Sequence, residues 1–393
     1  MPGSIAKHYT VSGYMIKKAF PILALSIFSC MLGAGIIIPL LPLYADSLGA
    51  TGISLGLIFA GFSITRAIFM PVIGRLSDRH GRKPFLSIGL LLYSFSALGL
   101  IWADNVPQLA LIRLLQGAIT AMIIPIAQAY VGDLSPEGEE GKWMGYSNAA
   151  FFISFGFGPF IGGLFTDYFG MDYAFATMGG LNLLAFLIVA LFLPESRQRK
   201  MASHPNPSLR EMGTSSMVRG LFSFRLSFAL ARGTLSCFLP IFAAIYVGLR
   251  ATFVGILLAA QHLVVSLLGV PGGHIADRFN RRALVILGAL TNLAYFTLIP
   301  LTHNFWQLLG LCCLGGLGGA ISMPAASALT VEEGRKFGMG SIMGIFNMAM
   351  SAGMAIGPLL GGVAVDLVGI NSAFYFAAGM GVIGAILFIW FTK

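Results

Sequence analysis

Gly74-Arg-Leu-Ser-Asp78-Arg-His-Gly-Arg-Lys83 is a short charged stretch between two long apolar runs. A second copy, Gly273-His-Ile-Ala-Asp-Arg-Phe-Asn-Arg-Arg282, stands 199 residues further on. The same offset relates Gly158-Pro159-Phe-Ile-Gly162-Gly163 to Gly357-Pro358-Leu-Leu-Gly361-Gly362. It also relates Pro125, Asn148, Asp167 and Gly170 to Pro324, Asn347, Asp366 and Gly369. One offset kept over about 90 residues indicates that the chain is a duplication of one unit.

Composition places this duplicated unit in a membrane. Of the 393 residues, 57% are hydrophobic and 10% are charged, whereas soluble domains have about 25% charged residues. This excludes a soluble globule or a soluble enzyme. Runs of about 20 apolar residues, long enough to cross a bilayer as a helix, are predicted near 19–44, 53–74, 84–103, 107–130, 142–166, 172–193, 221–247, 252–272, 283–301, 305–329, 338–363 and 371–391. We therefore expect an all-α polytopic membrane protein with twelve transmembrane helices in two pseudo-symmetric six-helix halves.

The positive charges lie almost entirely on one side of this bundle. With a cytoplasmic N-terminus, 20 of the 24 Lys and Arg residues fall in cytoplasmic segments and only Arg250 faces outward. Lys and Arg are retained on the cytoplasmic side of membrane proteins. The count predicts a multi-pass protein of the cytoplasmic membrane with both termini in the cytoplasm. It also accounts for the net charge of +9 without nucleic-acid binding.

The chain divides at 194–219, a segment that is rich in Ser, Pro, Lys and Arg and holds no apolar run. We interpret it as a cytoplasmic linker. It separates an N-terminal half at 19–193, preceded by a cytoplasmic segment at 1–18, from a C-terminal half at 220–393. Because six helices return the chain to the same side, the halves are parallel, and such halves bind substrate between them near the midplane.

The motifs resemble those of the major facilitator superfamily, in its twelve-helix drug/proton antiporter branch, over essentially the whole chain. The loop motif G-x-L-x-D-R-x-G-R-K/R is complete at 74–83, whereas its second copy has Asn280 in place of a glycine. The helix-four motif R-x-x-Q-G begins at Arg113. The helix-five antiporter motif spans 145–163, with Ser154 where the pattern has a glycine. The resemblance implies a secondary transporter, such as a multidrug efflux antiporter, that works by alternating access.

We predict that the loop motif forms a conformational latch. Asp78 is an anion suited to a helix N-terminus such as that of the eleventh helix, and Arg82 follows at the spacing of a helical ion pair. The alternative, a loop that only anchors the protein by its positive charge, requires neither the aspartate nor the glycines. The predicted latch comprises Gly74, Asp78, Arg79, Gly81, Arg82 and Lys83, together with Asp277 and Arg278 of the second copy.

The repeated Gly-Pro motif is predicted to bend the helices at the interface of the halves, which would serve a rocking motion. Close helix packing by the glycines is the alternative. The residues concerned are Gly158, Pro159, Gly162, Gly163, Gly357 and Pro358.

Four ionisable side chains fall at membrane depth, where such groups are costly and indicate function. They are Arg66, Arg113, Arg232 and His262. The family architecture implies a cavity lined by the first, fourth, seventh and tenth helices and flanked by helices that carry the other polar candidates. The predicted substrate cavity therefore comprises Arg66, Arg113, Gln116, Thr120, Asn148, Arg232, His262 and Asn347. A purely structural role for each arginine, and a hydrogen-bonded structural role for His262, remain open alternatives.

All 15 carboxylates fall in loops or at helix ends. Drug/proton antiporters commonly carry an acid within the membrane, so the sequence departs from the family pattern where coupling chemistry resides. Because buried guanidinium groups need an anionic or carbonyl partner, an anionic cargo would supply it. We therefore expect one of two arrangements. Either proton coupling uses an acid at a helix end, such as Asp46 or Asp133, or the protein exchanges anions without protons.

We expect a secondary transporter that exports amphipathic organic solutes, with organic-anion uptake or exchange without proton coupling as the alternative. The expected partners are a small organic substrate, protons as coupling ion and the lipid bilayer, and we expect a monomer. A membrane enzyme would need a nucleophile, an acid/base pair or a metal cluster, and the four cysteines show no metal-ligand spacing. We therefore expect no enzyme activity, no metal and no cofactor. A channel would not need latch sequences in both halves.

Overall fold

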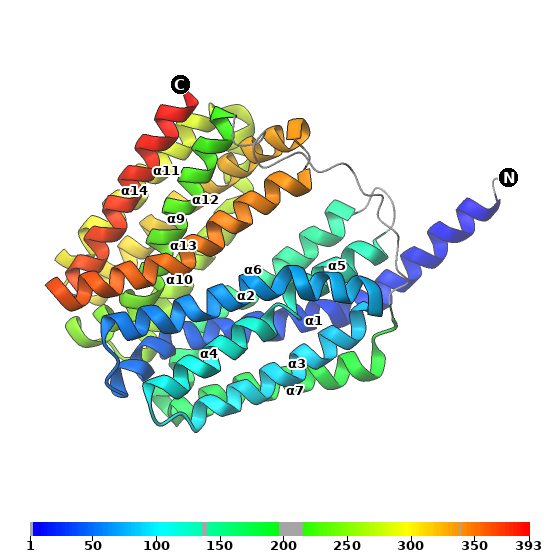
Figure 1. Ribbon diagram of the computed structural model, residues 1–393, viewed down its shortest axis with the longest axis horizontal. Coiled ribbons are helices and arrows are strands. Elements are labelled where there is room, and N and C mark those ends of the chain that lie inside the picture. Colours follow the sequence, from blue (N-terminus) through cyan, green and yellow to red (C-terminus); the bar gives the residue numbers. More distant parts are fainter. Residues whose placement is uncertain (1–2, 136–139, 196–214, 338) are drawn as a thin grey trace.

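The computed structural model describes residues 3–135, 140–195, 215–337 and 339–393, and this part of the chain is helical apart from short connections (Figure 1). In the N-terminal half the helices are α1 (Gly3–Ser47), α2 (Gly52–His80), α3 (Arg82–Ile101), α4 (Val106–Thr120), α5 (Ile124–Leu134), α6 (Glu140–Phe169) and α7 (Met171–Phe192). The single span predicted at 107–130 is divided between α4 and α5. Pro125, the second residue of α5, has no N–H to donate to the preceding turn, so the helix breaks there.

In the C-terminal half the elements are α9 (Ser216–Ile241), the π-helix η1 (Phe242–Tyr246), α10 (Ala251–Arg278), α11 (Arg281–Leu298), the 3-10 turn η2 (Ile299–Leu301), α12 (Phe305–Phe337), α13 (Met339–Val368) and α14 (Asn371–Thr392). Helix α9 begins inside the segment predicted as linker. The hydroxyl of Ser215 accepts a hydrogen bond from the Val218 N–H at 3.4 Å and caps this start.

The described residues contain 11 helical spans long and apolar enough to cross a membrane, the α4–α5 pair counting as one. Helix α6, with 30 residues, completes the predicted twelve. Proline occurs inside several spans, including α1, α2, α6 and α13, as membrane helices tolerate where neighbouring groups satisfy the freed backbone. The chain is a multi-pass all-α membrane protein, as its composition predicted.

Two helix pairs make the largest contacts between the halves (Figure 1). Helix α2 packs on α13, and α6 packs on α10. The offset of 199 relates α2 to α10 and α6 to α13, so the two pairs are equivalent by the internal repeat. Within the halves, α1 packs on α6 and α7, α3 on α7, α9 on α13 and α14, and α12 on α10 and α11.

The halves touch at one end of the bundle and diverge toward the other, where both chain termini lie (Figure 1). We call the first the gate end; there α2 begins at Gly52 and α10 at Ala251. The second is the latch end, where α2 ends at His80 and α10 at Arg278. A Cβ atom added at Gly74 or Gly273, near the latch end, would meet nothing within 4 Å. Helices α2 and α10 therefore contact the other half at the gate end but leave open space around these glycines near the latch end.

Candidate functional site

Backbone-to-backbone packing joins the halves at the gate end. A Cβ atom added at Gly56 would lie 2.6 Å from the Pro358 carbonyl oxygen, and one added at Gly52 would lie 2.6 Å from the Gly362 carbonyl oxygen. In the other pair, a Cβ at Gly163 would collide with the backbone of Ala251. Only glycine permits helices to approach so closely. In each pair, the two helix backbones are therefore in close contact at the gate end.

The remaining glycines of the Gly-Pro motif pack inside each half. Gly158 and Gly162 face the α1 backbone at Gly35 and Ile36, and Gly357 faces the α9 backbone at Leu230. Pro159 and Pro358 lie within α6 and α13. These contacts support the packing alternative, and bending of the helices stays a prediction.

Two carboxylates cross between the halves at the gate end. Asp366, at the end of α13, accepts hydrogen bonds from the Gly52 N–H at 2.7 Å and from the Ile53 N–H at 2.9 Å. Asp167, at the end of α6, accepts from the N–H groups of Ala251 at 3.2 Å and Thr252 at 2.8 Å. Donors and acceptors are related by the offset of 199. Each half therefore caps a helix N-terminus of the other with a negative charge, which the helix dipole favours. We call these contacts the reciprocal caps.

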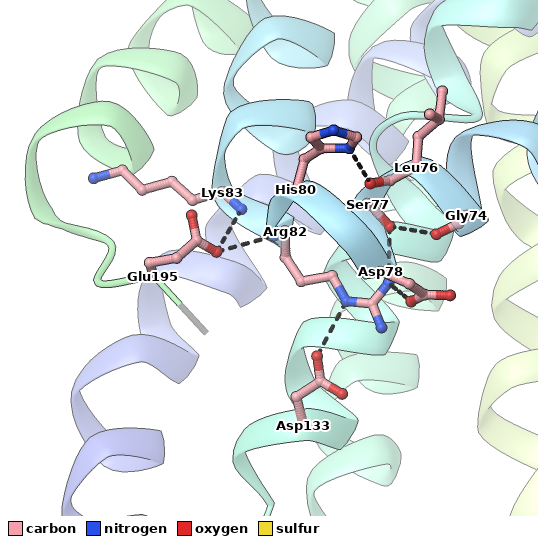
Figure 2. Close-up of polar contacts among 9 residues, drawn as sticks. All are labelled: Gly74, Leu76, Ser77, Asp78, His80, Arg82, Lys83, Asp133 and Glu195. Carbon is pink, nitrogen blue, oxygen red and sulfur yellow. Dashed lines mark hydrogen bonds and ion pairs between the residues drawn. The ribbon is translucent and has the colours of Figure 1, made fainter. Parts of the chain in front are cut away.

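At the latch end, Arg82 connects α2 to α5 (Figure 2). Its guanidinium lies 2.6 Å from Asp78 Oδ1, as the four-residue spacing predicted, and its Nε donates to Asp133 Oδ2 at 3.0 Å. It also donates to the Ser77 hydroxyl at 2.8 Å. The Asp78 side chain remains 58% exposed. In this conformation its described partner is Arg82, and a contact with the start of α13 remains a prediction for the opposite conformation.

Gly81 and Asn280 show why the two loop motifs differ. Gly81 has φ of 95°, which side chains disfavour, and α3 is capped instead by Glu195, whose Oε1 accepts from the N–H groups of Arg82 at 2.9 Å and Lys83 at 3.2 Å (Figure 2). Asn280 has φ of −61° and caps α11 itself through Oδ1. The second copy thus replaces a cap from a distant helix end by its own side chain.

The C-terminal half repeats the ion pair of the latch end. Arg281 and Glu332, the repeat positions of Arg82 and Asp133, form a salt bridge. Beside it the buried Glu333 accepts hydrogen bonds from Lys336 at 2.6 Å and from the Ser215 hydroxyl at 2.9 Å. The hydrogen bond to Glu333 raises the pKa of Lys336.

Two of the predicted latch residues, Arg79 and Arg278, take no part in these described contacts. Arg79 and Arg278 are exposed. Arg278 borders a shallow hollow at the end of α10 with His274 and Phe279. The side chain of Asp277 lies outside the described part of the structure.

Two of the predicted cavity residues form one unit in the C-terminal half. Arg232 on α9 lies 2.9 Å from His262 Nε2 on α10, and His262 Nδ1 lies 2.7 Å from the Leu258 carbonyl oxygen. Because the guanidinium only donates and the carbonyl only accepts, the ring carries its proton on Nδ1 and is neutral. Phe155 of α6 packs edge-on against the ring, with centroids 4.9 Å apart. The unit therefore lies where α10 meets the other half.

A second unit lies in the N-terminal half. Arg113 donates to Gln116 Oε1 at 2.9 Å, and its guanidinium lies 4.2 Å from the centre of the Phe62 ring. Arg66 follows Phe62 by one helical turn on α2, and Tyr93 is a buried residue of α3, which packs on α4. The predicted substrate residues thus form one basic unit in each half.

The last three cavity candidates are less informative. Thr120 is buried and donates to the Gly117 carbonyl at 2.9 Å. Asn347 is exposed on α13. The side chain of Asn148 lies outside the described part of the structure.

Comparison with known proteins decides the family. The profile of the Major Facilitator Superfamily matches residues 23–246 and 221–393. The chain belongs to the Major Facilitator Superfamily. Since the superfamily consists of transporters, the chain is a transporter and not an enzyme.

Among superfamily members, Multidrug resistance protein 2 of Bacillus subtilis is 28% identical over 389 residues, which cover 96% of each chain. The quinolone resistance protein NorA of Staphylococcus aureus is 26% identical over 383 residues, 95% of this chain and 96% of NorA. An uncharacterized MFS-type transporter of Methanocaldococcus jannaschii is 27% identical over 383 residues, 95% of this chain and 98% of the relative. These relatives confirm the resemblance to the drug/proton antiporter branch.

Solved structures of the superfamily share the fold. A bacterial homolog of the human lysosomal transporter Spinster matches with a TM-score of 0.80 at 14% identity, over 96% of this chain and 97% of the other. The human organic anion transporter MFSD10 matches with a TM-score of 0.66 at 19% identity, over 95% and 99%. At these identities the likeness shows the fold of the chain.

Several residues of this superfamily member were not singled out from the sequence. The recurrence of Asp167 as Asp366 was visible, but its role depends on which helix start lies beside each carboxylate. The pairing of Asp133 with Arg82 had a similar signal, because Glu332 and Arg281 recur at the same offset. No sequence signal pointed to Tyr93, since the third helix was expected to face lipid.

Proposed function

We propose that the chain exports amphipathic organic solutes across the cytoplasmic membrane by alternating access, with the halves at 19–193 and 220–393 rocking about a site between them. The observation that carries this proposal is the asymmetry of the interface. Glycine contacts and the reciprocal caps hold the halves together at the gate end. Near the latch end, a Cβ atom added at Gly74 or Gly273 would meet nothing within 4 Å. Two drug-resistance relatives, Multidrug resistance protein 2 and the quinolone resistance protein NorA, match along 95–96% of the chain and support efflux as the direction.

The orientation follows from charge. The latch end carries the loops at 75–83 and 278–282, which together hold seven Lys and Arg residues, whereas Arg250 lies at the gate end. Retention of Lys and Arg in the cytoplasm makes the latch end cytoplasmic. The proposed state is therefore inward-facing, in a monomeric transporter with both termini in the cytoplasm.

The cargo is proposed to be anionic. Arg113 and Arg232 each sit at membrane depth in hydrogen-bonded units that contain no described carboxylate. A cationic cargo would find no anion at this depth, since all 15 acids lie in loops or at helix ends. An anionic cargo would supply the counter-charge that buried guanidinium groups require.

A second function, organic-anion uptake or exchange without proton coupling, is favoured by the state of the titratable groups. His262 is held neutral between Arg232 and Leu258, and Asp133 is paired with Arg82. An anion that binds Arg232 would free His262 Nε2 to accept a proton; a proton that moves with the cargo is symport and cannot drive export, so His262 does not supply antiport. Coupled export therefore needs another acid, for which Asp46, exposed near the gate end, is the available candidate.

Transport into proteoliposomes tests both proposals. The purified protein is reconstituted, and uptake of 2-naphthoate and of ethidium is measured with an imposed pH gradient of either sign and with none. Coupled export predicts accumulation that reverses with the gradient and is lost in Asp46→Asn or Asp133→Asn. Exchange predicts counterflow of 2-naphthoate that is indifferent to the gradient. Movement of ethidium but not of 2-naphthoate would refute an anionic cargo, and no movement of either above protein-free vesicles would refute both functions.

A further inference from the structure

Within the described residues, the N-terminal half holds buried hydrogen-bond donors that no protein group accepts. The Tyr93 hydroxyl, Arg113 Nε and Gln116 Nε2 have no partner, and their side chains belong to residues that are at most 6% exposed. Buried polar groups are normally paired, because an unpaired donor keeps the full cost of leaving water. Three such groups on two adjacent helices, α3 and α4, indicate a site for an acceptor.

The internal hydrogen bonds fix the character of this site. Gln116 turns its Oε1 toward Arg113 at 2.9 Å, so its amide N–H groups point away from the guanidinium. The guanidinium of Arg113 can only donate. The unpaired nitrogen atoms are therefore obligate donors, and the ligand that satisfies them must bring acceptor atoms.

The charge of the site is positive. Tyr93 of α3 and Arg113 of α4 lie on packed neighbouring helices, and Arg66 stands one helical turn after Phe62, whose ring contacts the Arg113 guanidinium. The described acids of this half are engaged or distant: Asp133 pairs with Arg82 at the latch end, and Asp167 caps α10 at the gate end. An acceptor that carries negative charge is thus preferred to a neutral one.

The second repeat shows that the fold does not require these groups. At an offset of 199, Tyr93 is replaced by Asn292, Arg113 by Cys312, Gln116 by Gly315 and Arg66 by Val265. Asn292 donates to the Gly288 carbonyl at 2.8 Å, and Cys312 lies 3.7 Å from the Tyr295 hydroxyl. The same positions are therefore filled by apolar or satisfied groups when packing is their only task.

The geometry points to an oxyanion subsite in the N-terminal half, formed by Tyr93, Arg113 and Gln116 with Arg66 as a second positive charge. It would receive the carboxylate, sulfonate or phosphate head of an amphipathic cargo, while the ring of Phe62, 4.2 Å below the Arg113 guanidinium, borders the apolar body. The inference rests on the proposed function in taking the ligand to be the cargo. It adds Tyr93, which lies on a helix expected to face lipid, as a specificity-determining residue.

Equilibrium binding tests the subsite separately from transport. Isothermal titration calorimetry on the purified full chain in detergent compares 2-naphthoate, 2-naphthalenesulfonate and 2-naphthyl phosphate with the neutral 2-naphthamide. We expect at least one oxyanion to bind about tenfold or more tightly than the amide, since charge-assisted hydrogen bonds exceed neutral ones. Tyr93→Phe and Gln116→Leu, which keep the side-chain volume nearly unchanged, should each weaken that oxyanion by about tenfold and the amide by less than about threefold.

The matched control is Cys312→Ala, at the repeat position of Arg113, which should leave all four affinities unchanged. Equal losses for oxyanion and amide in Tyr93→Phe and Gln116→Leu would overturn the subsite, as would the absence of any preference for an oxyanion in the wild-type protein. Charge-selective binding in a protein that moves nothing in proteoliposomes would support the subsite and refute the proposed function. Transport of solutes without charge-selective binding would do the reverse.

Discussion

Replacing Asp366 with Asn, Asp167 with Asn, or both, removes the charge of the reciprocal caps and one of two acceptor oxygens in each. Both carboxylates are exposed, so solvent weakens their interaction with the helix dipole to the lower part of its range, about 0.3–1 kcal/mol. The lost hydrogen bond adds about 0.5–1.5 kcal/mol. We take about 1 kcal/mol for each carboxylate, which shifts the ratio of gate-closed to gate-open molecules about fivefold, and about 2 kcal/mol or 30-fold for both.

Spin labels measure this ratio directly. Asp104→Cys and His303→Cys are repeat mates, both exposed at the gate end on opposite halves, and the Cys313→Ala background removes the only native cysteine that is not buried. Pulsed electron resonance on the labelled protein gives the populations of short and long separations. If the reciprocal caps hold the gate end closed, the population with the long label separation should increase in each single variant and most in the double variant. The increase should be smaller at high salt.

Asp172→Asn is the matched control. Asp172 lies in the first turn of α7 at the same end of the bundle. The Asp172→Asn variant therefore removes a carboxylate near a helix start without changing the contact between the halves. An unchanged distribution in the double cap variant, or an equal change in Asp172→Asn, would show that the glycine packing alone holds the gate end closed.

Three further outcomes test other parts of the structure. Asp78→Asn should remain folded and lose about 0.3–2 kcal/mol of helix-terminus interaction in the opposite conformation, so transport should slow about 2- to 30-fold with little change in cargo affinity; wild-type rates would assign the loop to anchoring. Single cysteines in Ser203→Cys and Thr51→Cys should react with an impermeant maleimide from opposite sides of the membrane, and labelling of position 203 in intact cells would refute the orientation. Gly362→Trp should force the gate end open in the spin-label assay because a Cβ there already meets the Gly52 backbone, whereas Gly379→Trp, with nothing within 4 Å, should not.

The sequence predicted those features that depend on residues within a single helix or on the comparison of the two repeats. Apolar run length predicted the spans, and the spacing of Asp78 and Arg82 predicted their ion pair. The break between α4 and α5 was missed because Pro125 and the repeated Pro324 look alike in sequence, yet α12 continues through its proline.

Contacts between helices were harder to predict. The duplication revealed Asp167 and Asp366 as mates, but a carboxylate at the end of a helix reaches several neighbouring starts, and only packing selects one. Tyr93 was invisible for a related reason. Its helix was assigned to the lipid side as a whole, whereas one face of α3 is fully buried against the rest of the half.

The reciprocal caps also bear on how the chain arose. Asp366 meets the residues at 52 and 53, and Asp167 meets those at 251 and 252, so each partner surface is a copy of the other. This is the self-complementary contact of a two-fold homodimer. A six-helix ancestor with one aspartate and one helix start would have closed on a second copy of itself by the same pair of contacts. Fusion of two such copies would place that dimer interface inside a single chain, where its two sides are free to diverge in sequence.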